Sequence, residues 1–149
     1  MKNIFKSFII ALVSVVTLTG CTETYTAYTF AVETGDNIKV ELNTSKGHDL
    51  TSGVPFYVMK DETSIADGNF IPATDYDDYV MTIKNTPDAT LIEENEKNGV
   101  KYIFYSVNNA EFNYIISING SNTGVIMGSS VSTDAANEAF DLLTFSVEK

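Results

Sequence analysis

From residue 28 onwards, apolar and polar residues alternate in short runs that end in sequences typical of turns. A two-residue period places every second side chain on the same side, which is the pattern of a β-strand with one buried face. Turn residues such as Asn-Gly between two such runs favour a tight reversal of the chain. The sequence therefore predicts an antiparallel sheet built from β-hairpins. The predicted hairpins cover residues 28–43, 90–107 and 111–131, with their turns at residues 34–37, 98–99 and 119–124.

The segments between and after the hairpins are less regular. Residues 45–53 are rich in Gly, Ser and charged residues and predict a loop, whereas residues 54–61 predict a strand. Residues 63–71 are expected to turn at the pair Asp67-Gly68. A short final strand is predicted over residues 144–149.

Two segments change to a period of three to four residues, which predicts amphipathic helices. The first covers residues 74–85, where Thr74 is the expected N-cap and aspartates follow in the first turn. The second covers residues 133–143, with Ser132 or Thr133 as its N-cap. Two helices packed on an antiparallel sheet of hairpins give the α+β class. The predicted apolar faces consist of Tyr76, Tyr79, Val80 and Ile83 in the first helix, and Ala136, Ala139, Phe140 and Leu143 in the second.

The start of the chain has the layout of an export signal. Lys2 and Lys6 form a short positive segment, residues 8–16 form an apolar core interrupted only by Ser14, and small residues lead to Cys21. The apolar stretch is too short to cross about 30 Å of hydrocarbon comfortably. We therefore expect a secretory signal peptide here and not a transmembrane helix.

The tetrapeptide Leu18-Thr19-Gly20-Cys21 resembles the lipobox of bacterial lipoproteins. The resemblance implies transfer of diacylglycerol to the Cys21 sulfur and cleavage of the chain before that residue. A thiolate is the nucleophile that this thioether formation needs, and the chain has one cysteine. Two or more acyl chains anchor a protein stably in a membrane. The expected organisation is a signal peptide over residues 1–20, the lipidated cysteine and a tether over 21–27, and one α+β domain over 28–149.

Charge limits the partners of the mature domain. Lys2 and Lys6 leave with the signal peptide and every acidic residue stays, so the formal net charge of −11 becomes −13. The chain has no arginine and one histidine. We expect no binding to nucleic acid, whose phosphates need clustered cations, and no cofactor is predicted. The absence of arginine, with many Asn, Ile, Lys and Thr residues, favours a Gram-positive surface over an outer membrane.

The order of the predicted elements resembles the Mog1/PsbP/DcrB-like fold. The resemblance covers most of residues 28–149: a helix precedes two hairpins, and the chain ends in a helix and a strand. The terminal motif is carried by Ala136, Ala139, Phe140, Leu143 and residues 144–146. The family includes photosystem accessory proteins, a Ran-binding protein and bacterial lipoproteins. Membership would imply an accessory or binding role without naming the partner.

The sequence offers few residues for catalysis. His48 is the only histidine, and its Lys-Gly-His-Asp context predicts a solvated loop. A Ser-His-Asp arrangement would need His48 as its base, and no G-x-S-x-G motif is present. Paired carboxylates within residues 75–78 or 93–96 could serve glycoside hydrolysis. We favour the structural explanations: the electrostatics of a helix start for the first group and the solvent face of a hairpin for the second.

The carboxylates could also bind calcium, because this ion prefers hard oxygen ligands. Asp67 lies close in sequence to Asp75, Asp77 and Asp78, although their spacing is not that of an EF-hand. These four residues are the candidate metal ligands.

Aromatic residues supply the last candidate site. Tyr102 and Phe104 lie on one predicted strand, and Tyr114 lies on its expected partner. Aromatic pairs across strands stabilise a sheet by themselves. The alternative is a platform that binds a peptide, a glycan or a small ligand, with these three residues as the binding residues.

Together these features predict a lipid-anchored, extracytoplasmic, non-catalytic domain that binds another protein of a bacterial envelope. Its membrane contact is expected through Cys21. One alternative is a lipoprotein that binds a solute or Ca²⁺, and a weaker one is a small hydrolase.

Overall fold

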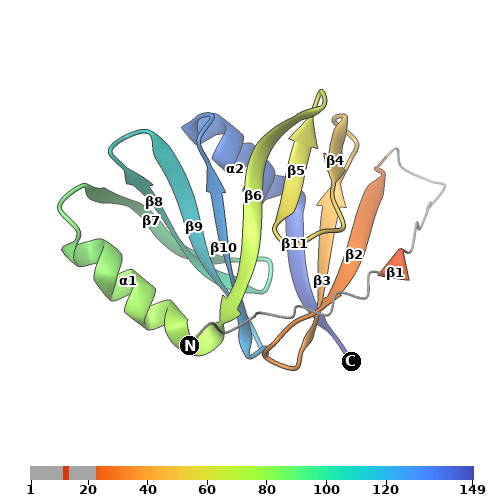
Figure 1. Ribbon diagram of the computed structural model, residues 1–149, viewed down its shortest axis with the longest axis horizontal. Helices are drawn as coiled ribbons and strands as arrows, with labels where there is room; N and C mark the ends of the chain where they lie inside the picture. The colour runs from red at the N-terminus through yellow and green to blue at the C-terminus, as the bar shows by residue number, and fades with distance from the viewer. Residues whose placement is uncertain (1–11, 14–22) are drawn as a thin grey trace, which may run out of the picture.

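The computed structural model describes residues 12–13 and 23–149, which form two antiparallel sheets and two α-helices (Figure 1). Apart from residues 12–13, the predicted signal peptide and the predicted lipidation site, Cys21, lie outside the described residues. Within the described ranges, no helix is long and apolar enough to cross a membrane.

The smaller sheet consists of four strands. In spatial order they are β1 (Leu12–Val13), β2 (Tyr25–Ala31), β3 (Asn37–Asn43) and β11 (Leu143–Glu148). The hairpin predicted over residues 28–43 is confirmed as β2 and β3, in which Phe30 lies opposite Ile38. β2 already begins at Tyr25, so residues 25–27 pair with β3 and belong to the domain, not to the tether in which the sequence places them. The predicted final strand is confirmed as β11, which pairs with β3 and closes this sheet.

The larger sheet consists of seven strands. In spatial order they are β4 (His48–Leu50), β5 (Phe56–Lys60), β6 (Thr63–Pro72), β10 (Thr123–Ser129), β9 (Glu111–Ile118), β8 (Val100–Val107) and β7 (Ala89–Lys97). The hairpins predicted over residues 90–107 and 111–131 are confirmed as β7–β8 and β9–β10. Asn98 and Gly99 have φ values of 51° and 79°, the positive values that a two-residue turn of this type requires.

Two local predictions are wrong. Residues 45–53 are not all loop, because His48–Leu50 form β4 and pair with β5. The chain does not turn at Asp67-Gly68, because β6 runs straight through this pair and the reversal occurs at Asp61 and Glu62. Gly68 serves close packing instead, since a Cβ there would lie 2.2 Å from Cζ of Phe56.

The helices follow β6 and β10 along the chain. The first helical segment begins as a 3₁₀ turn, η1 (Ala73–Asp75), and continues as α1 (Tyr76–Asn85), while the second is α2 (Thr133–Leu142). Ser132 caps α2 as predicted, because its side chain accepts a hydrogen bond of 3.0 Å from the Ala135 backbone N–H. Thr74 is not the N-cap of α1, because it lies within η1, which takes up the first predicted turn. The Thr74 hydroxyl donates instead to the Asp75 carboxylate at 3.2 Å.

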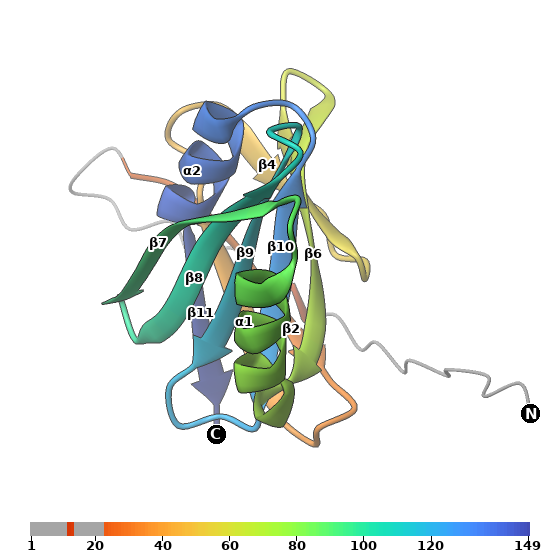
Figure 2. The ribbon, with the colours of Figure 1, turned by 90° about the vertical axis from the view of Figure 1, so that its left-hand side faces the viewer.

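The larger sheet is covered on both faces. The smaller sheet and α2 pack on one face, and α1 packs on the lower half of the other face (Figures 1 and 2). The buried side chains accordingly form two clusters. The main cluster contains Phe30, Ile38, Val40, Leu42, Phe56, Val58, Phe104, Ile116, Val125 and Met127 among others, and the cluster under α1 contains Tyr76, Ile83, Ile103 and Ile115.

Asp36 ties the β2–β3 turn of the smaller sheet to the β9–β10 turn of the larger one. Its carboxylate accepts hydrogen bonds from the Ser121 hydroxyl at 2.6 Å, the Asn122 backbone N–H at 2.8 Å and the Thr123 hydroxyl at 3.0 Å. These bonds, the one from Ser121 above all, lower the pKa of Asp36 despite its partial desolvation. The turns at this end of the molecule are therefore held by a charged acceptor whose bonds favour the ionised form.

β7 is the outer edge of the larger sheet, and nearly its whole length is exposed. The register against β8 shifts between Leu91 and Glu93, so Ile92 stands at a β-bulge with 49% of its surface exposed. Three glutamates follow, at residues 93, 94 and 96. A bulge and charges on an edge strand discourage pairing with another strand.

We predict that Gly68→Ala lowers the free energy of unfolding by about 1–3 kcal/mol, the range for overpacking a filled core. The added methyl group would meet the Phe56 ring, which is fully buried. Urea unfolding followed by circular dichroism measures the change. Gly53→Ala is the control, because a Cβ there would meet nothing closer than 3.7 Å. Equal stability of the two variants would contradict the packing role.

Candidate functional site

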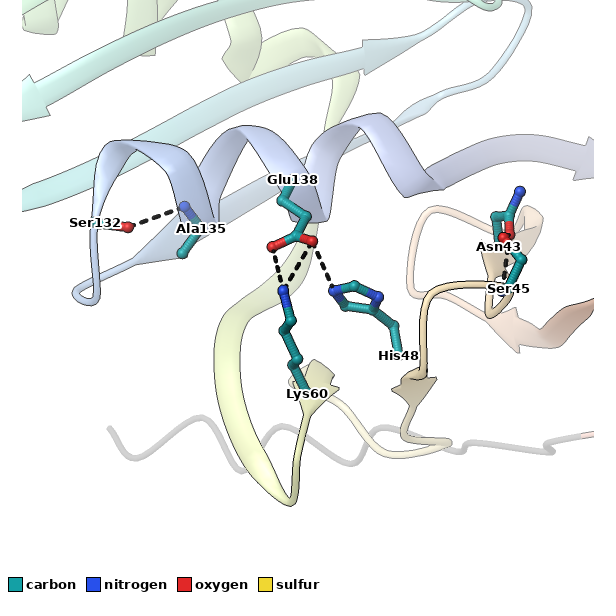
Figure 3. A network of polar contacts seen from close by, with 7 residues as sticks. All are labelled: Asn43, Ser45, His48, Lys60, Ser132, Ala135 and Glu138. Atoms are coloured by element: carbon teal, nitrogen blue, oxygen red, sulfur yellow. Dashed lines mark hydrogen bonds and ion pairs between the residues drawn. The ribbon is translucent and has the colours of Figure 1, made fainter.

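His48 lies in a buried polar cluster and not in the solvated loop that the sequence predicts. It is the first residue of β4 and lies opposite Lys60 of β5, while Glu138 reaches down from α2 (Figure 3). The His48 side chain is fully buried, with its Nε2 atom 3.3 Å from Oε1 of Glu138. The prediction is wrong because α2 covers this end of the β4–β5 hairpin.

Glu138 is the centre of this cluster. The ammonium group of Lys60 donates to both carboxylate oxygens at 3.0 Å. The Lys60 hydrogen bonds, aided by the charges of Lys60, His48 and Lys46, lower the pKa of Glu138 against the opposing effect of partial desolvation. The arrangement favours an ionised carboxylate and links α2 to the β4–β5 hairpin.

The geometry around His48 does not complete a nucleophilic site. Apart from the 3.3 Å contact between Nε2 and Glu138, neither ring nitrogen has a hydrogen-bond partner within residues 23–149, so no described hydroxyl group is positioned to lose a proton to the imidazole. A nucleophile and its base must lie within hydrogen-bond reach of each other. The cluster of His48, Lys60 and Glu138 can fix the helix on the sheet, and we interpret it as a structural clamp.

The aromatic candidates Tyr102, Phe104 and Tyr114 are buried, with 5%, 2% and 3% of their surface exposed. The Tyr114 ring stacks on Phe104 with centroids 4.4 Å apart and on Phe140 of α2 at 4.2 Å. The alternative of an accessible platform is wrong for these three side chains, because α2 covers the face on which they lie. They stabilise the packing of α2 on β8 and β9.

The hydroxyl groups of the two tyrosines point to polar partners at the edge of this core. Tyr102 donates to Glu93 at 2.8 Å, and Tyr114 donates to Asn137 at 2.7 Å. Burial, followed by the hydrogen bond to Glu93, raises the pKa of Tyr102 to about 12. Burial likewise raises the pKa of Tyr114. Both phenols therefore stay protonated in neutral solution and act as hydrogen-bond donors.

The candidate calcium ligands are spread over two elements. Asp67 lies in the middle of β6, whereas Asp75, Asp77 and Asp78 lie around the start of α1, beyond the far end of the same strand. Nowhere in the described part of the chain do three or more His, Cys, Asp or Glu side chains come close enough together to hold a metal ion. Asp77 instead faces Lys101 at 3.8 Å.

One hollow lies between the β7–β8 turn and the junction of α2 with β11. Phe140, Leu143 and Phe145 contribute to its lining, and it offers about 10 Å³ to the centre of a water molecule. This is the space that one water needs, so the hollow does not hold a larger ligand.

The outer face of the larger sheet carries a row of side chains that the sequence analysis missed. Tyr57 of β5 lies opposite Asp67 of β6, which lies opposite Gly128 of β10, followed by Asn113 of β9 and Tyr105 of β8. We call these five residues the outer-face row. Each of them has a neighbour on its strand whose side chain lies in the main core. Successive side chains of a strand alternate between its faces, so the side chains of the row lie on the opposite face of the larger sheet.

The polar groups of the outer-face row have free hydrogen-bonding capacity. Within residues 23–149, neither Asp67 nor Asn113 makes a hydrogen bond or an ion pair through its side chain. The Asn113 amide lies across Gly128, because a Cβ at residue 128 would come 2.4 Å from its Oδ1 atom. Partial burial raises the pKa of the Asp67 carboxyl. The row thus presents a carboxylate and an amide to solvent, and neither has a side-chain partner among the described residues.

Compared with known protein families, curated proteins and solved structures, this chain has no match. The function of this domain therefore has to be argued from its own residues.

We predict that Glu138→Gln weakens the dependence of stability on acid pH. The pKa of Glu138 in the folded protein is lowered from its unfolded value, which is about 4.3. Its carboxylate therefore stabilises the fold above the unfolded pKa, and this contribution is lost as the pH falls through the folded pKa. We expect the Tm of the unsubstituted protein to fall more steeply than that of Glu138→Gln between about pH 5 and pH 3.

Thermal unfolding at a series of pH values measures this difference. Glu96→Gln is the matched control, because Glu96 is exposed on β7 and has no ion pair within the described ranges. Identical pH profiles for Glu138→Gln and the unsubstituted protein would contradict the role of Glu138 in the clamp.

Proposed function

We propose that this protein is a lipid-anchored, extracytoplasmic accessory domain that binds a partner in a bacterial envelope. The observation that carries the proposal is the sequence Leu18-Thr19-Gly20-Cys21 at the end of an apolar run, with the only cysteine of the chain at its last position. Lipidation of Cys21 would leave a very short tether before β2, which begins at Tyr25. The domain would then lie close to the membrane surface.

The roles of the chemically reactive side chains support a binding function over catalysis. His48 is taken up by the clamp with Glu138 and Lys60. The buried tyrosines hold α2 on the sheet through contacts with the Phe140 ring, which is stacked on Tyr114 and tilted against Tyr102. The acidic side chains of α1 and β7 are paired in part with lysines, as Glu94 is with Lys84 at 3.0 Å.

The Mog1/PsbP/DcrB-like resemblance belongs to this proposal. What supports it is the order of elements along the chain, in which α1 precedes the hairpins β7–β8 and β9–β10, and α2 and β11 end the chain. An accessory role in a membrane complex is the function that such a resemblance implies.

A lipoprotein that binds a solute is the second candidate. The specific observation in its favour is the outer-face row, whose carboxylate and amide have no partner within residues 23–149.

We predict that Cys21→Ala abolishes incorporation of labelled palmitate and moves the protein from the membrane fraction to the soluble one. The physical reason is the loss of the sulfur atom to which the acyl-bearing group would be joined. Metabolic labelling and fractionation of the bacterial cells that express the full chain measure both effects. Thr22→Ala, which keeps the cysteine, is the matched control. Continued labelling of the Cys21→Ala protein would contradict the proposed anchor.

A further inference from the structure

The outer-face row lies on the part of the larger sheet that α1 leaves open. α1 packs over Ile103, Ile115 and the lower part of the sheet, and β6 and β10 extend beyond it (Figure 2). Tyr57 and Asp67 are exposed there, with 38% of the tyrosine surface open to solvent. Asn69, two residues along β6, is exposed on the same face.

The centre of the row is covered by the Asn113 amide. Neighbouring strands of a sheet lie about 4.8 Å apart, so the backbones at Asp67 and Asn113 stand about 10 Å apart across the sheet. The residue between them is Gly128, which has no side chain. The Asn113 amide reaches over this glycine, since a Cβ at residue 128 would lie 2.4 Å from its Oδ1 atom, and it therefore extends toward the strand that carries the Asp67 carboxylate.

The polar groups at the centre of the row match an uncharged ligand that both donates and accepts hydrogen bonds. A carboxylate accepts, and the amides of Asn69 and Asn113 do both. One carboxylate with two amides favours a neutral ligand, since recognition of a cation would be expected to use several acidic groups. The formal net charge of −11 opposes anionic ligands.

Aromatic rings stand at the two ends of the row. Tyr57 offers an exposed ring at one end. At the other end Tyr105 is half-buried beside Tyr79 of α1, close enough for the two phenols to influence each other. An aromatic face packs well against the apolar C–H side of a ring-shaped ligand, and its hydroxyl group can still reach a polar partner.

We propose that the outer-face row binds a neutral oligosaccharide, with one sugar ring over the Asp67 carboxylate and the Asn113 amide and a second ring stacked on Tyr57. Asp67 and Asn113 bind the hydroxyl groups of the central sugar, and Asn69 lines the same surface. A site built to hydrogen-bond hydroxyl groups rejects analogues that lack them, which gives the row its specificity. The inference deepens the proposed function by naming a ligand class for the solute-binding candidate.

Isothermal titration calorimetry tests the proposal on the lipidated full-length product, purified in a zwitterionic detergent without sugar head groups. The probes are chitotetraose, cellotetraose and maltotetraose. We expect saturable binding of at least one probe. Tyr57→Ala should weaken it about tenfold, the size of one lost aromatic contact. Tyr25→Ala is the matched control, because Tyr25 is 36% exposed but lies on β2 of the other sheet.

Two further substitutions probe the centre of the row. Gly128→Ala pushes the Asn113 amide aside, and since that amide is the end of a flexible side chain the fold should remain. Asp67→Asn keeps the shape of the side chain and removes its charge. Both substitutions should weaken sugar binding several-fold while the circular dichroism spectrum of the protein stays unchanged. If Gly128→Ala does not fold, Asp67→Asn still tests the centre of the row.

Three results would overturn the proposal. The first is the absence of saturable binding for all three oligosaccharides. The second is a loss of binding in Tyr25→Ala equal to that in Tyr57→Ala, which would place the site elsewhere. The third is binding of tetralysine, lost in Asp67→Asn, without binding of any sugar, which would indicate a cationic peptide. Palmitate labelling tests the anchor separately, so the failure of one proposal is distinguishable from the failure of the other.

Discussion

Four phenylalanine rings between the two sheets are the contact on which the rest of the structure depends. Phe30 from the smaller sheet lies 5.2 Å from Phe70 and 6.2 Å from Phe56 of the larger sheet, and Phe145 lies 6.2 Å from Phe56. Burying one such ring contributes about 1.5–3 kcal/mol. Because Phe56 is held inside, the next residue of β5 must point outward. The packing of the core therefore determines which side chains lie on the outer face of the larger sheet.

Much of the fold could be predicted because its signals are local. The Asn98-Gly99 turn and the Ser132 cap act over a few residues, and both are confirmed. The pair Asp67-Gly68 shows the limit of such signals, since a glycine that leaves room for an aromatic ring looks the same in sequence as a glycine that turns the chain. The pairing of β6 with β10 could not be predicted, because it joins segments far apart in the chain.

The candidate site was harder to predict for the same reason. His48 has the sequence context of a loop, and its burial depends on Glu138 of α2, far along the chain. Tyr102 and Tyr114 have the alternation of strand residues, which does not say whether a helix covers them. Asp67 was singled out as a metal ligand, but its neighbours in the outer-face row come from four other strands. Only the register of the sheet brings them together.

The exposed edge formed by β7 has a consequence for a protein tethered to a membrane in the way that we propose. Tethered copies diffuse in two dimensions with a common orientation, so their sheet edges would meet far more often than in free solution. The glutamates of β7 repel each other in such an encounter, and the bulge at Ile92 breaks the regular ladder that a second strand would need. The repulsion acts over about 8 Å at physiological ionic strength. Tethered copies could therefore cover a surface densely without pairing their β7 edges into fibres. This protection would weaken at high salt, because salt screens the repulsion between the glutamates.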